Sequence, residues 1–120
     1  MRVTSALWVA ALVRRAFGVD TPAMVSRRGA EEAGSIFVAI DRLDGTLDLY
    51  APAPQTAFAT AKPEIRLFNL VRSRASQPEI DAVIARELDF DPDIWVVVVE
   101  DRAGRAPFEV TPEPSGRPES

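Results

Sequence analysis

The segment DFDPDIWVVVVE, residues 89–100, contains the carboxylates best arranged to bind a metal ion. It matches the calcium-loop pattern D-x-[DN]-x-[DN]-G-x5-E at every position except the glycine, which is Ile94 here. Calcium prefers oxygen ligands, and the loop would supply them from four acids. These acids are Asp89, Asp91, Asp93 and Glu100.

Two geometric arguments oppose a calcium loop. The sixth position requires a sharp turn, and the β-branched side chain of Ile94 resists the positive φ that glycine supplies there. Residues 95–99 have strong strand character, so Glu100 would lie roughly 23 Å from Asp93 at about 3.3 Å per residue. We therefore expect an acidic turn followed by a buried strand. Divalent-cation binding by the three aspartates in another geometry is the alternative.

A second pair of carboxylates lies on a predicted β-hairpin made of residues 36–42 and 47–51. Asp44-Gly45 between them is typical of a two-residue type I′ turn. Closing that turn pairs Ile40 with Leu49 and Val38 with Ala51. One core face then carries five apolar residues: Ile36, Val38, Ile40, Leu47 and Leu49.

The same register places Asp41 opposite Asp48 on the other face of the hairpin. Facing carboxylates could bind a metal ion or serve acid–base chemistry, although like charges in this position destabilise a sheet. The alternative is that both are solvated or are neutralised by Arg27 or Arg28 from a neighbouring strand.

Charge is distributed unevenly along the chain. Six acids and no base lie between Glu87 and Asp101, whereas the N-terminal segment carries five arginines against Asp20 alone. Arginine binds carboxylates through two parallel hydrogen bonds, so we expect the two regions to meet within a chain or across a dimer. The five arginines are Arg2, Arg14, Arg15, Arg27 and Arg28.

Several other side chains are candidates for contacts with a partner. Tyr50 and Gln55 belong to an aromatic, proline-rich and polar patch after a predicted strand, where loops often carry function. Arg14 and Arg15 could bind an anion, but no glycine-rich loop accompanies them. Trp95 lies in an apolar run, which favours a position in the core.

The residue types that are missing restrict the chemistry further. The 120 residues include no histidine and no cysteine, which removes the commonest general base, the commonest transition-metal ligand and any thiolate. We therefore expect no cofactor. The net charge of −4 disfavours a nucleic-acid-associated protein or a binder of anionic membranes. The apolar run of residues 6–13 is too short to span a membrane and is followed by arginines, so we expect a cytoplasmic protein.

The elements that must position these residues predict an α+β domain. It has an N-terminal helix, a mainly antiparallel sheet of four or five strands, and a second helix before the last strand. Residues 65–72 fit a strand or a short helix, and we favour the strand. The helices are expected at 5–17 and 77–88, and the strands at 25–28, 36–42, 47–51, 65–72 and 94–99.

Domain boundaries and oligomeric state follow from the same patterns. We expect one domain over residues 1–103 and a disordered, proline-rich tail over 104–120. The two helices could cover one face of the sheet. The uninterrupted apolar strand near residue 96 then needs cover on its other face, which predicts a homodimer.

Three segments resemble those of a known family: LWVAALVRR near the start, DGTLDLYAPAPQ in the middle and RELDFDPDIWVVVVED near the end. The family they resemble is a small bacterial domain-of-unknown-function family, DUF1491, of about this length. The resemblance covers roughly residues 3–101. It implies one short soluble domain and supplies no activity, cofactor or site residue.

The function itself is not specified by these residues. We favour a small non-enzymatic interaction or regulatory module, homodimeric and with a possible protein partner. A carboxylate-based enzyme or metal-binding protein is the first alternative, and a nucleic-acid-associated protein that uses the N-terminal arginines is the second.

Overall fold

The computed structural model describes residues 3–53 and 66–110. Two helices and six strands lie in these ranges. In chain order they are α1 (Ser5–Gly18), β1 (Ala23–Arg27), β2 (Ile36–Asp41), β3 (Leu47–Pro52), β4 (Leu67–Ala75), α3 (Gln77–Phe90), β5 (Trp95–Glu100) and β6 (Glu109–Val110).

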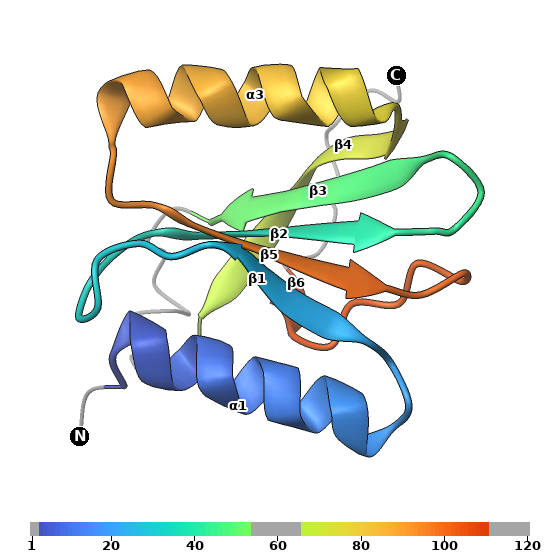
Figure 1. Cartoon of the computed structure of the whole chain (residues 1–120), viewed down its shortest axis with the longest axis horizontal. Coiled ribbons are helices and arrows are strands. Elements are labelled where there is room, and N and C mark those ends of the chain that lie inside the picture. Colours follow the sequence, from blue (N-terminus) through green and yellow to red (C-terminus); the bar gives the residue numbers. More distant parts are fainter. Residues whose placement is uncertain (1–2, 54–65, 111–120) are drawn as a thin grey trace, which may run out of the picture.

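The strands form one sheet in the order β1-β5-β2-β3-β4-β6 (Figure 1). The pairs β1·β5, β2·β3 and β3·β4 are antiparallel, and the pairs β2·β5 and β4·β6 are parallel. The predicted α+β class and mainly antiparallel sheet are therefore confirmed. The segment near residue 70 is a strand, as favoured, and it extends to Ala75.

The two helices lie on opposite faces of the sheet (Figure 1). One buried cluster joins α1 to β2 and β5 through residues such as Leu12, Val38 and Val97. A second cluster joins α3 to the other face, where Ile80 meets Leu49 and other residues. The expectation that both helices share one face is wrong. Strand β5 is apolar on both faces because each face meets a helix of the same chain, so its burial does not require a second copy.

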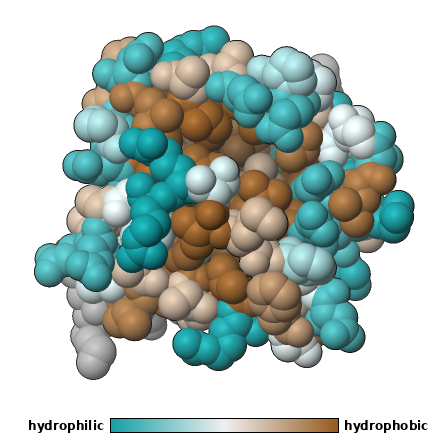
Figure 2. Space-filling model, viewed as in Figure 1, coloured by the Kyte–Doolittle hydropathy of each residue, from teal (hydrophilic) through white to brown (hydrophobic). Residues whose placement is uncertain are grey.

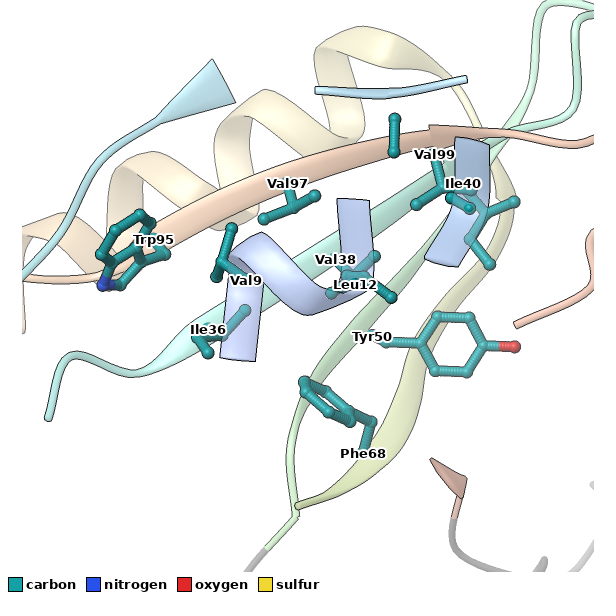
Figure 3. Packing of buried hydrophobic residues seen from close by; sticks show 12 residues of the cluster. Val9, Leu12, Ile36, Val38, Ile40, Tyr50, Phe68, Trp95, Val97 and Val99 are labelled. Carbon is teal, nitrogen blue, oxygen red and sulfur yellow. The ribbon is translucent and has the colours of Figure 1, made fainter. Parts of the chain in front are cut away.

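The α1 side of the core is drawn in Figure 3, where Val9 and Leu12 project toward the strands. Beside them lies a group of four rings, in which the centroids of Phe68 and Phe108 are 4.7 Å apart. Phe108 also meets Tyr50 edge to face at 5.1 Å, and Trp8 lies 5.2 Å from Phe68. Such pairs add to the stability gained from burying the ring area.

Phe108 belongs to the segment that the sequence assigns to the tail. Residues 106 and 108 pack on the α1-side cluster, and β6 pairs with β4 through Leu67 and Phe68. The described domain therefore extends to Val110, and residues 111–120 lie outside the described residues.

The predicted register of the β2–β3 hairpin is wrong by one residue. The observed pairs are Val38↔Tyr50, Ala39↔Leu49, Ile40↔Asp48 and Asp41↔Leu47.

The connection is the longer loop of residues 42–46 rather than a two-residue turn. It is closed by the amide of Arg42, which donates to the carbonyl of Thr46 at 3.0 Å. Leu43 and Gly45 both adopt positive φ values, of 62° and 91°. Because side chains alternate along a strand, this shift moves Leu47 and Leu49 to the α3 face, whereas Ile36 and Ile40 face α1.

Candidate functional site

A buried ion pair lies at the end of the sheet where β2 turns into β3. Asp48 is 2% exposed, and its Oδ2 accepts from the Arg42 guanidinium, from Nη2 at 2.8 Å and Nε at 3.0 Å. Its Oδ1 accepts from the backbone amide of Arg74 at 2.8 Å. Both carboxylate oxygens are therefore occupied, and the bond to Asp48 raises the pKa of Arg42. This carboxylate holds β2, β3 and β4 together and is closed to a substrate or a metal ion.

Asp41, the expected partner of Asp48, has a separate role. Its Oδ1 accepts from the amide of Leu43 at 2.9 Å and so stabilises the loop that follows it. Asp44 accepts from Thr46 in the same way, and these bonds lower the pKa of Asp44. The predicted facing of Asp41 and Asp48 is wrong, because Asp48 lies across from Ile40. The structure does not bring these two residues together as a carboxylate pair.

Two further titratable groups near this end have pKa values shifted by their surroundings. The hydrogen bonds from Arg105 lower the pKa of Asp101, which accepts from Arg105 Nη2 at 2.8 Å. Burial raises the pKa of Tyr50, and the nearby charge of Asp48 adds to this rise. Both shifts favour the form that is already present at neutral pH, the ionised acid and the neutral phenol. Neither group is thereby prepared for proton transfer.

The acidic turn after α3 is organised by its own backbone. The Oδ1 of Asp91 accepts from the amide of Asp93 at 3.0 Å, and the amide of Asp91 donates to the carbonyl of Glu87. Asp89 and Asp93 are exposed. Within residues 3–53 and 66–110, no group of three or more acids is arranged to hold a metal ion.

The N-terminal arginines do approach this acidic run, but they contact other atoms. Arg27 Nη2 donates to the carbonyl of Pro92 at 2.9 Å, and the Arg28 guanidinium lies 5.0 Å from the centre of the Trp95 ring. Arg15 Nη2 donates to the carbonyl of Pro107 at 3.0 Å. Among the described residues, no ion pair joins these arginines to the acids of residues 87–101.

The loop of residues 29–34 connects the start of α1 to the start of β5. Glu32 and Glu31 accept from the amides of Ser5 and Ala6 through their carbonyls, at 3.1 and 2.9 Å. Ser5 Oγ donates to the carbonyl of Gly34 at 2.6 Å.

The same loop is fixed to β5 by two further bonds. The indole Nε1 of Trp95 donates to the carbonyl of Ala30, and the amide of Ala30 donates to the carbonyl of Asp93. A methyl group at Gly29 would overlap the backbone of Asp93 and Ile94, so glycine is required there. These bonds place Glu31 and Glu32 at the N-terminal end of α1.

The outward face of α1 carries two large apolar side chains that are exposed. Leu7 is 62% exposed and Phe17 is 57% exposed, and Ala10 and Arg14 lie exposed between them. In Figure 2, brown and tan residues lie among teal and white ones over the lower part of the molecule, where Figure 1 places α1. Burial of Leu12 and its neighbours explains only the inward face of this helix.

Strand β1 is also exposed at the edge of the sheet, and Met24 on it is 57% exposed. It is five residues long, its register with β5 shifts between Val25 and Arg27, and Arg28 follows at its end. Short length, a bulge and arginines are the features by which natural edge strands avoid pairing with other chains. The α1 face carries Arg14, but it is a regular helix surface on which Leu7 and Phe17 are exposed.

The five residues that the sequence suggests for partner contacts lie in different environments. Arg14 and Arg15 are exposed on α1, whereas Tyr50 and Trp95 are buried at 8% and 1% exposure. Gln55 lies outside the described residues. Sequence reasoning missed four residues, Leu7, Phe17, Glu31 and Glu32, although the apolar circumference of the first helix was a signal for two of them.

The fold is a small α+β domain with one helix on each face of its sheet. Among the described residues, the acids and arginines discussed above do not come together in one reactive site. The family model of DUF1491, described as a protein of unknown function, matches residues 3–109, and the chain belongs to this family. No protein of the curated set matches it. Neither helix of the described residues has the length and the apolar character needed to cross a bilayer.

Three solved structures resemble the chain closely. The solution structure of protein Atu0922 from A. tumefaciens is 38% identical, with a TM-score of 0.81 over 95% of this chain and 98% of that one. The crystal structure of a DUF1491 family protein from Caulobacter crescentus CB15 is 37% identical, with a TM-score of 0.74 over 93% and 100%. The NMR structure of a DUF1491 family protein from the same organism is 38% identical, with a TM-score of 0.73 over 93% and 99%. None of these names assigns an activity.

Proposed function

We propose that the protein is a non-enzymatic interaction module that works as a homodimer. The observation that carries this proposal is the outward face of α1, where Leu7 and Phe17 are exposed although the fold does not need them there. Apolar side chains exposed together in a soluble domain mark surfaces that bind a partner.

The state of the charged groups supports a binding role over a catalytic one. The most buried acid, Asp48, has both oxygens occupied by Arg42 and the Arg74 amide. Asp101 is likewise held by Arg105. A catalytic acid or base needs a free position for substrate and a pKa moved toward neutrality, and neither acid has these properties.

Sedimentation velocity of the full chain over a wide concentration range tests the proposal. We expect a monomer–dimer equilibrium with a dissociation constant on the order of 10 μM, because one helix face is a small interface. A species that stays monomeric to millimolar concentration would contradict it.

Thermal melting tests the metal-binding alternative in the same samples. We expect millimolar Ca²⁺ or Mg²⁺ to leave the melting temperature unchanged. A metal ion that bound the native state would raise it. A rise that Asp91→Asn abolishes would favour a metal site at the acidic turn.

We also propose that the protein acts in a bacterial cytoplasm. Its sequence contains no cysteine, which suits a reducing compartment. Fractionation of the native cells followed by immunodetection tests this, and recovery in the periplasmic or membrane fraction would contradict it.

A further inference from the structure

We infer that the dimer forms by antiparallel packing of α1 against α1 of a second copy. This inference rests on the proposed function and names its interface. Figure 1 shows α1 at the outside of the molecule, with the sheet on one side of it only. The opposite side presents the stripe of Leu7, Ala10, Arg14 and Phe17.

The spacing of this stripe makes it one continuous surface. Its residues follow one another at steps of three, four and three positions, which keeps them on the same face of a helix. Ala10 and the half-buried Ala11 form its centre. Small side chains at the centre let two helix axes approach closely, while larger ones at the two ends provide the apolar contact.

The stripe is complementary to itself only in the antiparallel direction. A two-fold axis level with Leu12 places Leu7 against Phe17 of the second copy, and Ala10 against Arg14 of the second copy. Large residues then meet at both ends, and the small alanine makes room for the arginine stem. Both helices use the same surface, as an isologous dimer requires.

Charge gives independent support for the same direction. The loop of residues 29–34 fixes Glu31 and Glu32 at the N-terminal end of α1, and Arg14 lies in its C-terminal half. All three side chains are exposed, and none makes an ion pair among the described residues. Antiparallel packing brings Arg14 of each copy to the acids of the other. Parallel packing would bring like charges together.

A charge-exchange experiment tests this arrangement. Arg14→Glu is one variant, and Glu31→Arg with Glu32→Arg is the other. In each variant alone, the facing groups of two copies carry the same charge. We expect each to dimerise at least about tenfold more weakly than the wild type.

Mixing the two variants in equal amounts is the decisive measurement. In the mixed dimer, opposite charges face each other at both ends, because one copy carries only acids at these positions and the other carries only arginines. Sedimentation velocity should therefore show association restored to near the wild-type level. Circular dichroism of each variant serves as the check that the fold is intact. If the wild type dimerises but both variants do so equally well, or if mixing restores nothing, the α1 interface is wrong while the homodimer proposal stands.

An apolar substitution with a matched control separates the interface from general surface effects. Leu7→Lys and Phe17→Lys should each weaken dimerisation by about tenfold or more, because apolar anchors dominate small interfaces. Phe90→Lys is the control, since Phe90 is 82% exposed at the end of α3, on the opposite face. Equal weakening by all three would overturn the assignment to α1. A monomeric wild type would instead overturn the proposed function.

Discussion

The two helices are alike in length and in covering the sheet, but they differ in the side chains that they expose to solvent. Each has 14 residues and covers one face of the sheet. The outward positions of α3 include three acids, Glu79, Asp81 and Asp89, and one large apolar side chain, Phe90, at its last residue. The outward positions of α1 include Leu7 and Phe17, and α1 contains no acid.

This difference shows which apolar residues the fold itself requires. Helix α3 covers its face of the sheet with Ile80 and a few partly buried neighbours, so a one-sided apolar stripe is sufficient. Helix α1 buries a similar inward set, including Val9, Leu12 and Ala16. Its outward apolar residues are additional to that set. A function beyond folding is the simplest reason for them.

The largest expected difference in stability is between a substitution on the inward face of α1 and one on its outward face. Leu12→Ala removes a fully buried side chain and should lower the free energy of unfolding by about 3–4 kcal/mol. Leu7→Ala should change it by less than about 0.5 kcal/mol at concentrations where the monomer predominates. Urea unfolding of the dilute proteins measures both. Similar losses in the two variants would mean that the outward face also serves the fold.

The next effect compares an acid inside the domain with an acid on the surface of α3. Asp48→Ala leaves the Arg74 amide and the Arg42 guanidinium without their acceptor, so we expect a loss of about 3 kcal/mol. Asp89→Ala is the control and should leave stability nearly unchanged, because Asp89 is exposed. The urea midpoint of each variant gives the comparison. If Asp48→Ala leaves stability unchanged, Arg42 finds water or another partner at no cost in free energy.

A smaller effect tests whether the two helices start in equivalent ways. Thr4 Oγ1 accepts from the amide of Leu7 at 3.2 Å, and Ser76 Oγ accepts from the amide of Glu79 at 3.3 Å. Thr4→Ala and Ser76→Ala should each lower stability by about 1 kcal/mol. Thermal melting compares them directly. A much larger loss for Thr4→Ala would indicate that docking of α1 on the loop of residues 29–34 depends on its cap.

The smallest effect concerns pH. Arg105 holds the pKa of Asp101 below its ordinary value, so this group stabilises the fold above that ordinary pKa, and the stabilisation is lost as the pH falls through the lowered pKa. The loss should therefore occur below about pH 4. In Asp101→Asn this contribution is absent, and the urea midpoint should fall less between about pH 5 and pH 2.5 than in the wild type. An identical pH dependence in both proteins would contradict the assignment.

The secondary structure could be predicted from the sequence because the signals for it are local. The predicted helices, 5–17 and 77–88, end within two residues of the observed α1 and α3, and Ser76 caps the start of α3 by accepting from the amide of Glu79. The apolar run near Val97 correctly indicated a strand buried on both faces. The sequence could not predict what covers those faces, because burial alone does not distinguish a helix of the same chain from another copy.

The hairpin and its charges depended on geometry that the sequence leaves open. Asp44-Gly45 suggested a two-residue turn, but the amides of Leu43 and Thr46 donate to the carboxylates of Asp41 and Asp44, and these bonds favour a longer loop. The one-residue shift then moved Asp48 away from Asp41 and toward Arg42, a partner six positions earlier. The acids beside the N-terminal end of α1 could not be predicted either, because Glu31 and Glu32 reach that helix only through tertiary contacts.

The pairing of β1 with β5 has a consequence for how the chain folds. In the described residues β1 has no other strand partner, and the loop of residues 29–34 holds α1 against the start of β5. On the ribosome, β1 must therefore wait for residues 95–100 before it can pair, for several seconds at about 5–20 residues per second, and the packing of α1 is incomplete until then. Contacts between such distant segments also slow folding in solution. Formation of the last long strand thus completes the domain, and a chain that stops before Ile94 leaves β1 without a strand partner and α1 without Trp95, Val97 and Val99 of its core.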